Sequence, residues 1–169
     1  MRKTDYLVSD AVLSPCGTYR YLLRRGWSDE KPLGVVMLNP STADAAADDN
    51  TIRRCAAFAR SFGHGGVLVA NLFAYRATRP GDLALAADPV GPDNFRYVGM
   101  LLEQVDYVLC AWGANGALLG QGRTMGEFLA ARTKMYCLGT NRDGSPKHPL
   151  YVRSSMQLMP YALPACQSG

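Results

Sequence analysis

Four short, mainly apolar segments, separated by stretches with helical patterns, constrain the fold of this chain more than any other feature. They span residues 33–38, 67–70, 107–111 and 134–138. Runs of this length and composition are typical of strands that are buried on both faces of a sheet. Strands that alternate with helices are joined by right-handed crossovers and therefore lie parallel. The sequence predicts an α/β fold, namely a three-layer α/β/α domain around a four-stranded parallel sheet.

The segments around these strands predict the remaining elements. Two strand-like runs on either side of a Ser-Pro-Cys-Gly turn predict an N-terminal β-hairpin over about residues 11–26. A loop rich in proline, glycine and aspartate follows over residues 76–91. We expect one domain, residues 1–169, in which the hairpin joins an α/β core over about residues 33–160. Helices are expected over residues 48–62, 93–104 and 115–132.

Composition and charge limit the classes of partner. Hydrophobic residues make up 48% of the chain and charged residues 19%, which is typical of a globular protein. The formal net charge of +4 permits an anionic partner, although a dedicated nucleic-acid binder usually carries a denser basic stripe. The five cysteines include no CxxC pair, which favours a reducing compartment and argues against a disulfide framework or a cysteine-bound metal. No segment is typical of a signal peptide or a membrane span, so we expect a cytoplasmic protein without a membrane partner.

A polar cluster follows each of the four predicted strands. The carboxyl ends of parallel strands share one edge of the sheet, and ligands bind along that edge. Clusters that are far apart in the sequence would therefore converge on one site. The clusters are residues 38–42 (LNPST), 71–76 (NLFAYR), 112–116 (WGANG) and 147–151 (KHPLY).

Two asparagines and one histidine are the main candidates for chemistry at this edge. Asn39 would hold a water or a substrate atom, although an Asn-Pro-Ser-Thr stretch is also an ordinary strand end with a capped turn. Asn71 would read an amide-like edge such as a nucleobase, or else bond neighbouring backbone. His148, stiffened by Pro149, would donate to a developing anion, or else be structural. The catalytic candidates are thus Asn39 and His148.

Other residues of the clusters are candidates for binding and for acid–base chemistry. Phe73 and Tyr75 can stack on a base, with core packing as the alternative. Asp44 is the candidate general acid or base, whereas Asp48 and Asp49 are expected to complement the dipole of the following helix. The two histidines of the chain have no third ligand nearby in sequence, which predicts no metal site and no cofactor. The candidate substrate-binding residues are Pro40, Ser41, Thr42, Asn71, Phe73, Tyr75, Arg76, Trp112, Gly113 and Asn115.

Six motifs carry a resemblance to a known family. They are LNPSTAD (38–44), DDNTIRRC (48–55), NLFAYRATRP (71–80), DPVGPDN (88–94), AWG (111–113) and HPLY (148–151). Together they resemble the bacterial and phage family known as domain of unknown function 1643. The resemblance extends over about residues 33–151 and implies no established activity.

The same clusters also resemble the uracil-DNA glycosylase superfamily, especially its mismatch-specific and thymine-DNA glycosylase branch. Its first motif, G-x-N-P-G, is similar to residues 37–41, which implies that Asn39 positions the attacking water. Its base-reading asparagine corresponds to Asn71, and its late His-Pro-Ser motif, which stabilises the departing base, corresponds to residues 148–150. A serine replaces the last glycine of the first motif and a leucine replaces the last serine of the late one. The resemblance implies a four-stranded parallel sheet and N-glycosidic hydrolysis.

Two functions from different classes follow from these observations. The first is a glycosylase-like enzyme, an N-glycosidic hydrolase, that acts on a nucleobase in DNA or in a nucleotide. The second is a non-catalytic module that binds a nucleotide or a modified base in the same cleft. It is favoured because Asn39 stands where the most active uracil enzymes have a carboxylate, and because the third position of the His-Pro motif is altered. A metal- or cysteine-dependent hydrolase is disfavoured by the spacing of the histidines and cysteines. The expected partner is a nucleic acid or a nucleotide. The sequence gives no indication of the oligomeric state.

Overall fold

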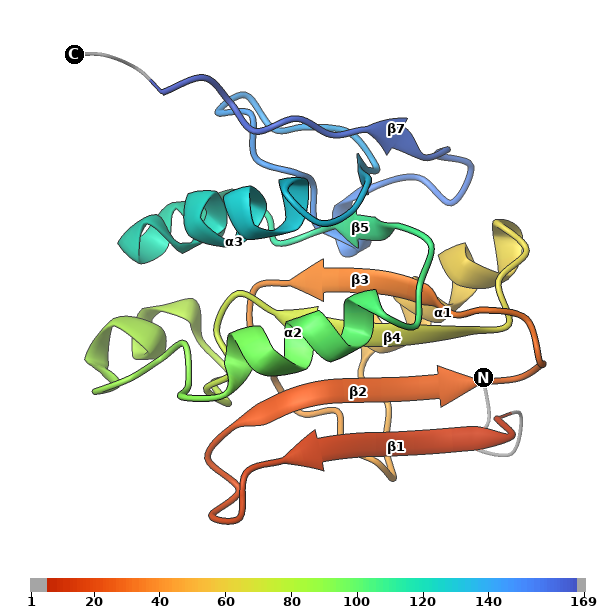
Figure 1. Ribbon diagram of the computed structural model, residues 1–169, viewed down its shortest axis with the longest axis horizontal. Helices are drawn as coiled ribbons and strands as arrows, with labels where there is room; N and C mark the ends of the chain where they lie inside the picture. The colour runs from red at the N-terminus through yellow and green to blue at the C-terminus, as the bar shows by residue number, and fades with distance from the viewer. Residues whose placement is uncertain (1–5, 167–169) are drawn as a thin grey trace.

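A seven-stranded mixed sheet forms the centre of the computed structural model, which describes residues 6–166 (Figure 1). The strand order is β1-β2-β4-β3-β5-β6-β7. The pairs β3–β4, β3–β5 and β5–β6 are parallel, whereas β1–β2, β2–β4 and β6–β7 are antiparallel. The predicted α/β class is confirmed, and the sheet is larger and mixed. The strands are β1 (Val8–Leu13), β2 (Arg20–Gly26), β3 (Leu33–Met37), β4 (Gly66–Asn71), β5 (Val108–Cys110), β6 (Met135–Cys137) and β7 (Met159–Pro160).

Helices cover both faces of the sheet (Figure 1). Neighbouring residues of β3 show the division, because Val35 packs with α1 while Val36 packs with α2 and α3. This alternation follows from the period of two along a strand, and it explains why the run at residues 33–38 is apolar throughout. The α-helices are α1 (Asn50–Ser61), α2 (Asn94–Leu102) and α3 (Gln121–Ala130), and the short 3₁₀ helices are η2 (Pro80–Leu85), η3 (Ala114–Gly120) and η4 (Pro149–Tyr151).

Three predicted elements differ from the structure. The expected helix over 115–132 is wrong in its first part, because η3 and α3 are separated by a kink at Leu118 and Leu119, next to Gly120 in the left-handed conformation (φ +66°). The N-terminal hairpin begins earlier than predicted and belongs to the main sheet through β2–β4 pairing. The loop over 76–91 contains η2.

A shift of register within the hairpin decides on which side of the sheet Arg20 lies. Val12 pairs with Leu22, whereas the next residue of β1, Leu13, pairs with Arg20, so Tyr21 is an extra residue in β2. An extra residue reverses the alternation of side chains along a strand. Tyr21 accordingly stacks on Tyr97 of α2, with ring centroids 4.8 Å apart, and Arg20 lies on the side of the sheet that α1 covers.

Two further observations concern residues 6–166. No helix in this range combines the length and the apolar character needed to cross a membrane. The five cysteines are all free thiols, and burial raises the pKa values of Cys55, Cys110 and Cys137.

Candidate functional site

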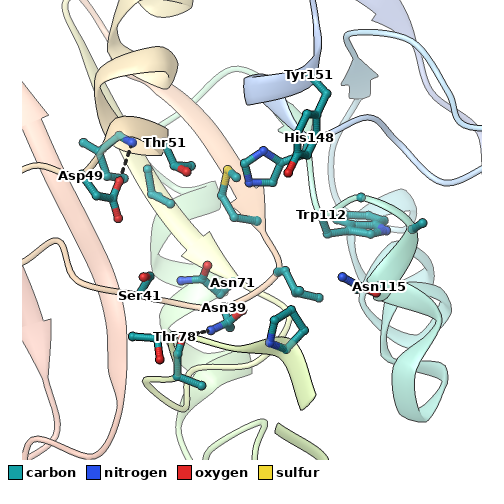
Figure 2. Close-up of a pocket in the computed structure, with 18 of the residues that line it drawn as sticks. Asn39, Ser41, Asp49, Thr51, Asn71, Thr78, Trp112, Asn115, His148 and Tyr151 are labelled. Atoms are coloured by element: carbon teal, nitrogen blue, oxygen red, sulfur yellow. Dashed lines mark hydrogen bonds between the residues drawn. The ribbon is translucent and has the colours of Figure 1, made fainter. Parts of the chain in front are cut away.

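A pocket of about 400 Å³ lies at the carboxyl ends of β3, β4 and β5, beside the first turn of α1 (Figure 2). Its walls come from segments that are far apart in the sequence, as expected for the carboxyl edge of parallel strands. Figure 2 shows Asn39, Asn71 and His148 turned toward the same cavity. The predicted site residues that line the pocket are Asn39, Ser41, Asn71, Trp112, Gly113, Asn115 and His148.

The other predicted site residues lie elsewhere. Phe73 is 0% exposed and packs in the core on the α2 and α3 side, so it offers no surface to a ligand in this pocket. Tyr75 packs against the same core and contacts Tyr19 edge-on. Asp44 accepts two backbone N–H groups of its own loop, which lower its pKa, and it does not line the pocket. Pro40, Thr42 and Arg76 also lie outside the pocket lining.

Asn71 is the most unusual residue of the pocket. Its side chain is 1% exposed, yet neither Oδ1 nor Nδ2 has a hydrogen-bond partner among the described residues. Its backbone is held firmly, because Asn94 Nδ2 donates to the Asn71 carbonyl at 2.9 Å. Asn94 and Gln121 both donate to the carbonyl of Leu72, at 3.2 and 3.1 Å. Leaving a buried polar group unpaired costs about 1–3 kcal/mol, and a ligand with a complementary donor and acceptor would remove that cost.

Asn39 is held in one orientation by its own amide group. Nδ2 donates to the carbonyl of Pro40 at 2.9 Å and to the carbonyl of Ala77 at 2.7 Å. These bonds tie the end of β3 to the start of the long loop. Because both N–H groups are used, Oδ1 is the group left to accept a hydrogen bond from a water or a ligand.

His148 presents a neutral imidazole to the pocket. Its Nδ1 accepts the backbone N–H of Leu150 at 3.2 Å, which places the proton of the neutral ring on Nε2. Burial lowers the pKa of His148 below its usual value, and the charge of Asp49 opposes this effect. At neutral pH the ring is therefore a hydrogen-bond donor without a charge.

The loop that carries His148 is fixed to α1 by one arginine. Arg54 donates to the carbonyl of Pro149 at 3.2 Å, to Ser154 Oγ at 2.8 Å and to the carbonyl of Val152. The motif residues DDNTIRRC and HPLY are thus joined in space.

Gly113 shapes the wall opposite α1. Its φ of +75° is in the left-handed region that favours glycine, and its N–H donates to the carbonyl of Pro146. Beside it, Trp112 is buried and packs edge-on against Tyr161. The exposed residue Asn115 lies at the rim.

The geometry of this pocket can be set beside known families. The model described as "Protein of unknown function (DUF1643)" matches residues 20–150, which is most of the chain. The chain belongs to this family. The matched region includes every residue that lines the pocket except Tyr151. No curated protein and no solved structure matches the chain significantly.

Some residues of the pocket were not among the predicted site residues, although several of them lie within the family's motifs. Asp49 was expected to complement the helix dipole; its Oδ1 caps α1 by accepting the N–H of Ile52 at 2.8 Å, and the residue also lines the pocket. Arg20 reaches the pocket from β2 because of the extra residue in that strand, a feature with no sequence signal. The remaining polar residues of this kind are Thr51, Thr78, Asn141 and Tyr151.

The acidic and thiol groups are not arranged for a metal. Within residues 6–166, no group of three or more His, Cys, Asp or Glu side chains is placed to hold a metal ion. Asp49 and His148 line the pocket, but no further residue of these types does so in the described part of the chain. The pocket offers amides, hydroxyls, one carboxylate, one imidazole and one guanidinium.

Proposed function

We propose that this protein hydrolyses the N-glycosidic bond of a nucleobase held in the pocket. The observation that carries the proposal is the unpaired, buried amide of Asn71 in the same pocket as the neutral imidazole of His148. An asparagine amide can pair with a donor and an acceptor on one base edge at the same time. A neutral Nε2–H can stabilise negative charge that develops on the departing base.

The reaction needs one water and no other co-reactant. The water, held by Asn39 Oδ1, adds to C1′ of the sugar while the bond from C1′ to the base nitrogen breaks. The electron pair of that bond passes to the base, where the hydrogen bond from His148 stabilises it. Asp49 accepts the proton that the water releases, and that proton then reaches the base through solvent. The products are a free base and a sugar with a hydroxyl at C1′.

The resemblance of two motifs to uracil-DNA glycosylases supports the same proposal. The pocket brings the two motifs together, since Asn39 and His148 both line it. The replaced positions, Ser41 and Leu150, do not carry the proposed chemistry, because neither supplies the water, the base contact or the anion contact. The five free thiols suit a reducing compartment, and we propose the cytoplasm.

A base-release assay tests the proposal. Purified protein is incubated with nucleosides, nucleotides and oligonucleotides that carry uracil, mismatched thymine or modified bases. Free base is measured by chromatography, and abasic sites in oligonucleotides by alkaline cleavage. We expect release by the native protein and its loss in Asn39→Ala and His148→Ala. His64→Ala is the matched control, because His64 contacts Tyr107 and does not line the pocket.

The outcomes separate an enzyme from a binding module. Release that depends on Asn39 and His148 supports hydrolysis. Saturable binding of a nucleotide without any release contradicts hydrolysis and favours the non-catalytic module. Release that survives both substitutions contradicts the roles assigned to these residues.

A further inference from the structure

Arg20 is a buried cation that the protein itself leaves largely unpaired. The residue is 3% exposed and lines the pocket. Its Nη1 donates to the carbonyl of Ala43 at 2.6 Å, and its Nε is buried without a partner. Burial lowers the pKa of Arg20 to about 10, which leaves the group charged at neutral pH. A buried charge without a counter-ion is unfavourable, and a bound anion would offset that cost.

Asp49 does not neutralise Arg20 by direct contact. The charge of Asp49 raises the pKa of Arg20, so the two groups attract each other across the pocket. No carboxylate oxygen of the described residues lies within 4.0 Å of a guanidinium nitrogen of Arg20. Asp49 is also engaged in capping α1 through its Oδ1. A nitrogen of the guanidinium therefore stays available for a ligand.

The surroundings of Arg20 suit a phosphate group. The pocket wall contains the aliphatic hydroxyl groups of Ser41, Thr51 and Thr78 and the phenol of Tyr151, which can donate to phosphate oxygens. Arginine presents a planar fork of N–H donors that matches the oxygens of a phosphate. The extra residue Tyr21 in β2 is what places Arg20 in the lining of this pocket and away from α2.

We propose that the pocket binds a free nucleotide, with its terminal phosphate on Arg20 and its base edge on Asn71. The inference rests on the proposed function and names its substrate class. A strand of nucleic acid is normally held by several exposed lysines and arginines along its backbone. Among the described residues of the pocket wall there is no lysine, and the single arginine is buried. A volume of about 400 Å³ is in the range of small-molecule sites.

This assignment changes the expected products. Water adds to C1′ of the nucleotide and the base departs with the electron pair of the broken bond. The second product is then a sugar phosphate, which keeps its contact with Arg20 after the base has left. Inorganic phosphate and sugar phosphates should therefore compete with the nucleotide.

Binding measurements on matched pairs test the proposal. Nucleoside 5′-monophosphates and the corresponding nucleosides are titrated into the full chain by calorimetry, with inorganic phosphate as competitor. A single-stranded oligonucleotide with the same base in an internal position is a separate arm. We expect the monophosphate to bind at least tenfold more tightly than its nucleoside, and more tightly than the oligonucleotide. Arg20→Met should abolish the difference between monophosphate and nucleoside, and Arg20→Lys should keep part of it.

Arg24→Met is the matched control. Arg24 lies on the same strand and also has a buried, unpartnered Nε, but it lines a different pocket. We expect Arg24→Met to keep the preference for the monophosphate. Because the native protein alone reports that preference, the test stands even where Arg20→Met fails to fold.

The results distinguish this inference from the proposed function. Equal binding of nucleoside and monophosphate, with base release from both, overturns the phosphate assignment and leaves the hydrolase intact. Tighter binding of the oligonucleotide overturns the free nucleotide in favour of a strand. No binding and no base release with any probe overturns both.

Discussion

β2 carries two buried arginines whose surroundings are opposite. Arg25 is 1% exposed and makes an ion pair with Asp48, with Nε and Oδ1 2.8 Å apart. It also donates to the carbonyls of Arg24, Asp44 and Ala47. Arg20, five residues earlier, has one carbonyl partner, from Ala43, and a buried Nε without any.

Two buried asparagines show the same contrast. Asn94 uses its Nδ2 to hold the carbonyls of Asn71 and Leu72, although its Oδ1 is buried without a partner among the described residues. Asn71 itself has no partner for either atom of its amide in the described part of the chain. Buried polar groups are normally paired, so the paired members of these couples support the fold. The unpaired members, Arg20 and Asn71, line one pocket, and we infer that a ligand completes them.

The largest effect on stability is expected when Arg25 loses its counter-ion. Asp48→Ala leaves the buried guanidinium of Arg25 without its counter-ion, and removing one partner of a buried ion pair costs about 3–5 kcal/mol. Arg20→Met loses one hydrogen bond, which contributes about 0.5–1.5 kcal/mol, and also removes an unpaired buried charge. Urea unfolding of both variants should show a large loss of stability for the first and little for the second. A similar loss in both would contradict the contrast.

The next largest effect concerns the rate of base release. Removing one preorganised donor to a developing anion lowers kcat by about 10²–10³-fold, and this is expected for His148→Ala. His64→Ala should keep the native rate, because His64 lies outside the pocket. Steady-state measurements on the substrate found by the base-release assay check this. A native rate in His148→Ala would remove the imidazole from the mechanism.

Substitutions of Asn94 and Asn71 are expected to affect different properties, namely stability for Asn94 and ligand binding for Asn71. Asn94→Ala leaves the Asn71 carbonyl without its side-chain donor, while the Leu72 carbonyl keeps the bond from Gln121, and the free energy of unfolding should fall by about 1–3 kcal/mol. Asn71→Ala removes an amide that has no partner, so it should leave stability unchanged within about 0.5 kcal/mol while it abolishes ligand binding. Denaturant titration and calorimetry on the two variants check both parts. Destabilisation by Asn71→Ala would show that its amide has a structural partner.

The sequence predicted the strands and the edge where the site lies, because these depend on local patterns. The apolar run at residues 33–38 contains β3, and the polar residue that ends β4 is Asn71, as the pattern indicated. Asn39 and His148 line the same pocket although they are more than a hundred residues apart. Strand polarity brings the ends of β3 and β6 to the same edge of the sheet. The bonds from Arg54 then hold the loop that carries His148 beside α1.

The residues that the sequence did not place depend on tertiary features. Simple alternation along β2 puts Arg20 on the same side as Leu22, and the extra residue Tyr21 reverses this. The sequence left two alternatives open for Phe73, stacking on a base or packing in the core, and the structure shows the second, because Phe73 is buried on the α2 and α3 side. A bulge leaves no periodic signal in the sequence.

A smaller effect is expected from the arginine that holds the loop carrying His148. Arg54→Met removes the bonds between α1 and the segment that follows His148. Because a misplacement of about 1 Å can cost 10²-fold in rate, we expect a partial loss, about tenfold in kcat, with KM little changed. Arg53→Met is the control, since Arg53 bonds the side chain of Asn50 in the first turn of α1 and the carbonyl of Asp48 just before the helix. An unchanged kcat in Arg54→Met would exclude the positioning role.

The smallest effect concerns pH. Burial lowers the pKa of His148 below its unfolded value of about 6.5, so the ring stays a neutral donor above that pH. The rate of base release should vary little between about pH 7 and 9 and should fall as acid protonates the ring. The unfolded state takes up this proton first, so stability also falls below about pH 6.5, by an amount that His148→Ala removes. A rate that rises as the pH falls through 6 would contradict a neutral donor.

The central claim is that a ligand pairs with the unpaired groups of Asn71 and Arg20. The most direct test follows the side-chain signals of these two residues by nuclear magnetic resonance during a nucleotide titration. Isotope-labelled protein is titrated with the nucleoside 5′-monophosphate that binds most tightly, and Asn71→Ala assigns the resonance. We predict that the side-chain NH₂ signals of Asn71 and the Nε–H signal of Arg20 shift with the same saturation curve, while the signals of Asn94 and Arg25 stay in place. Unchanged signals of Asn71 and Arg20 at saturation would contradict the claim that the ligand completes these two groups.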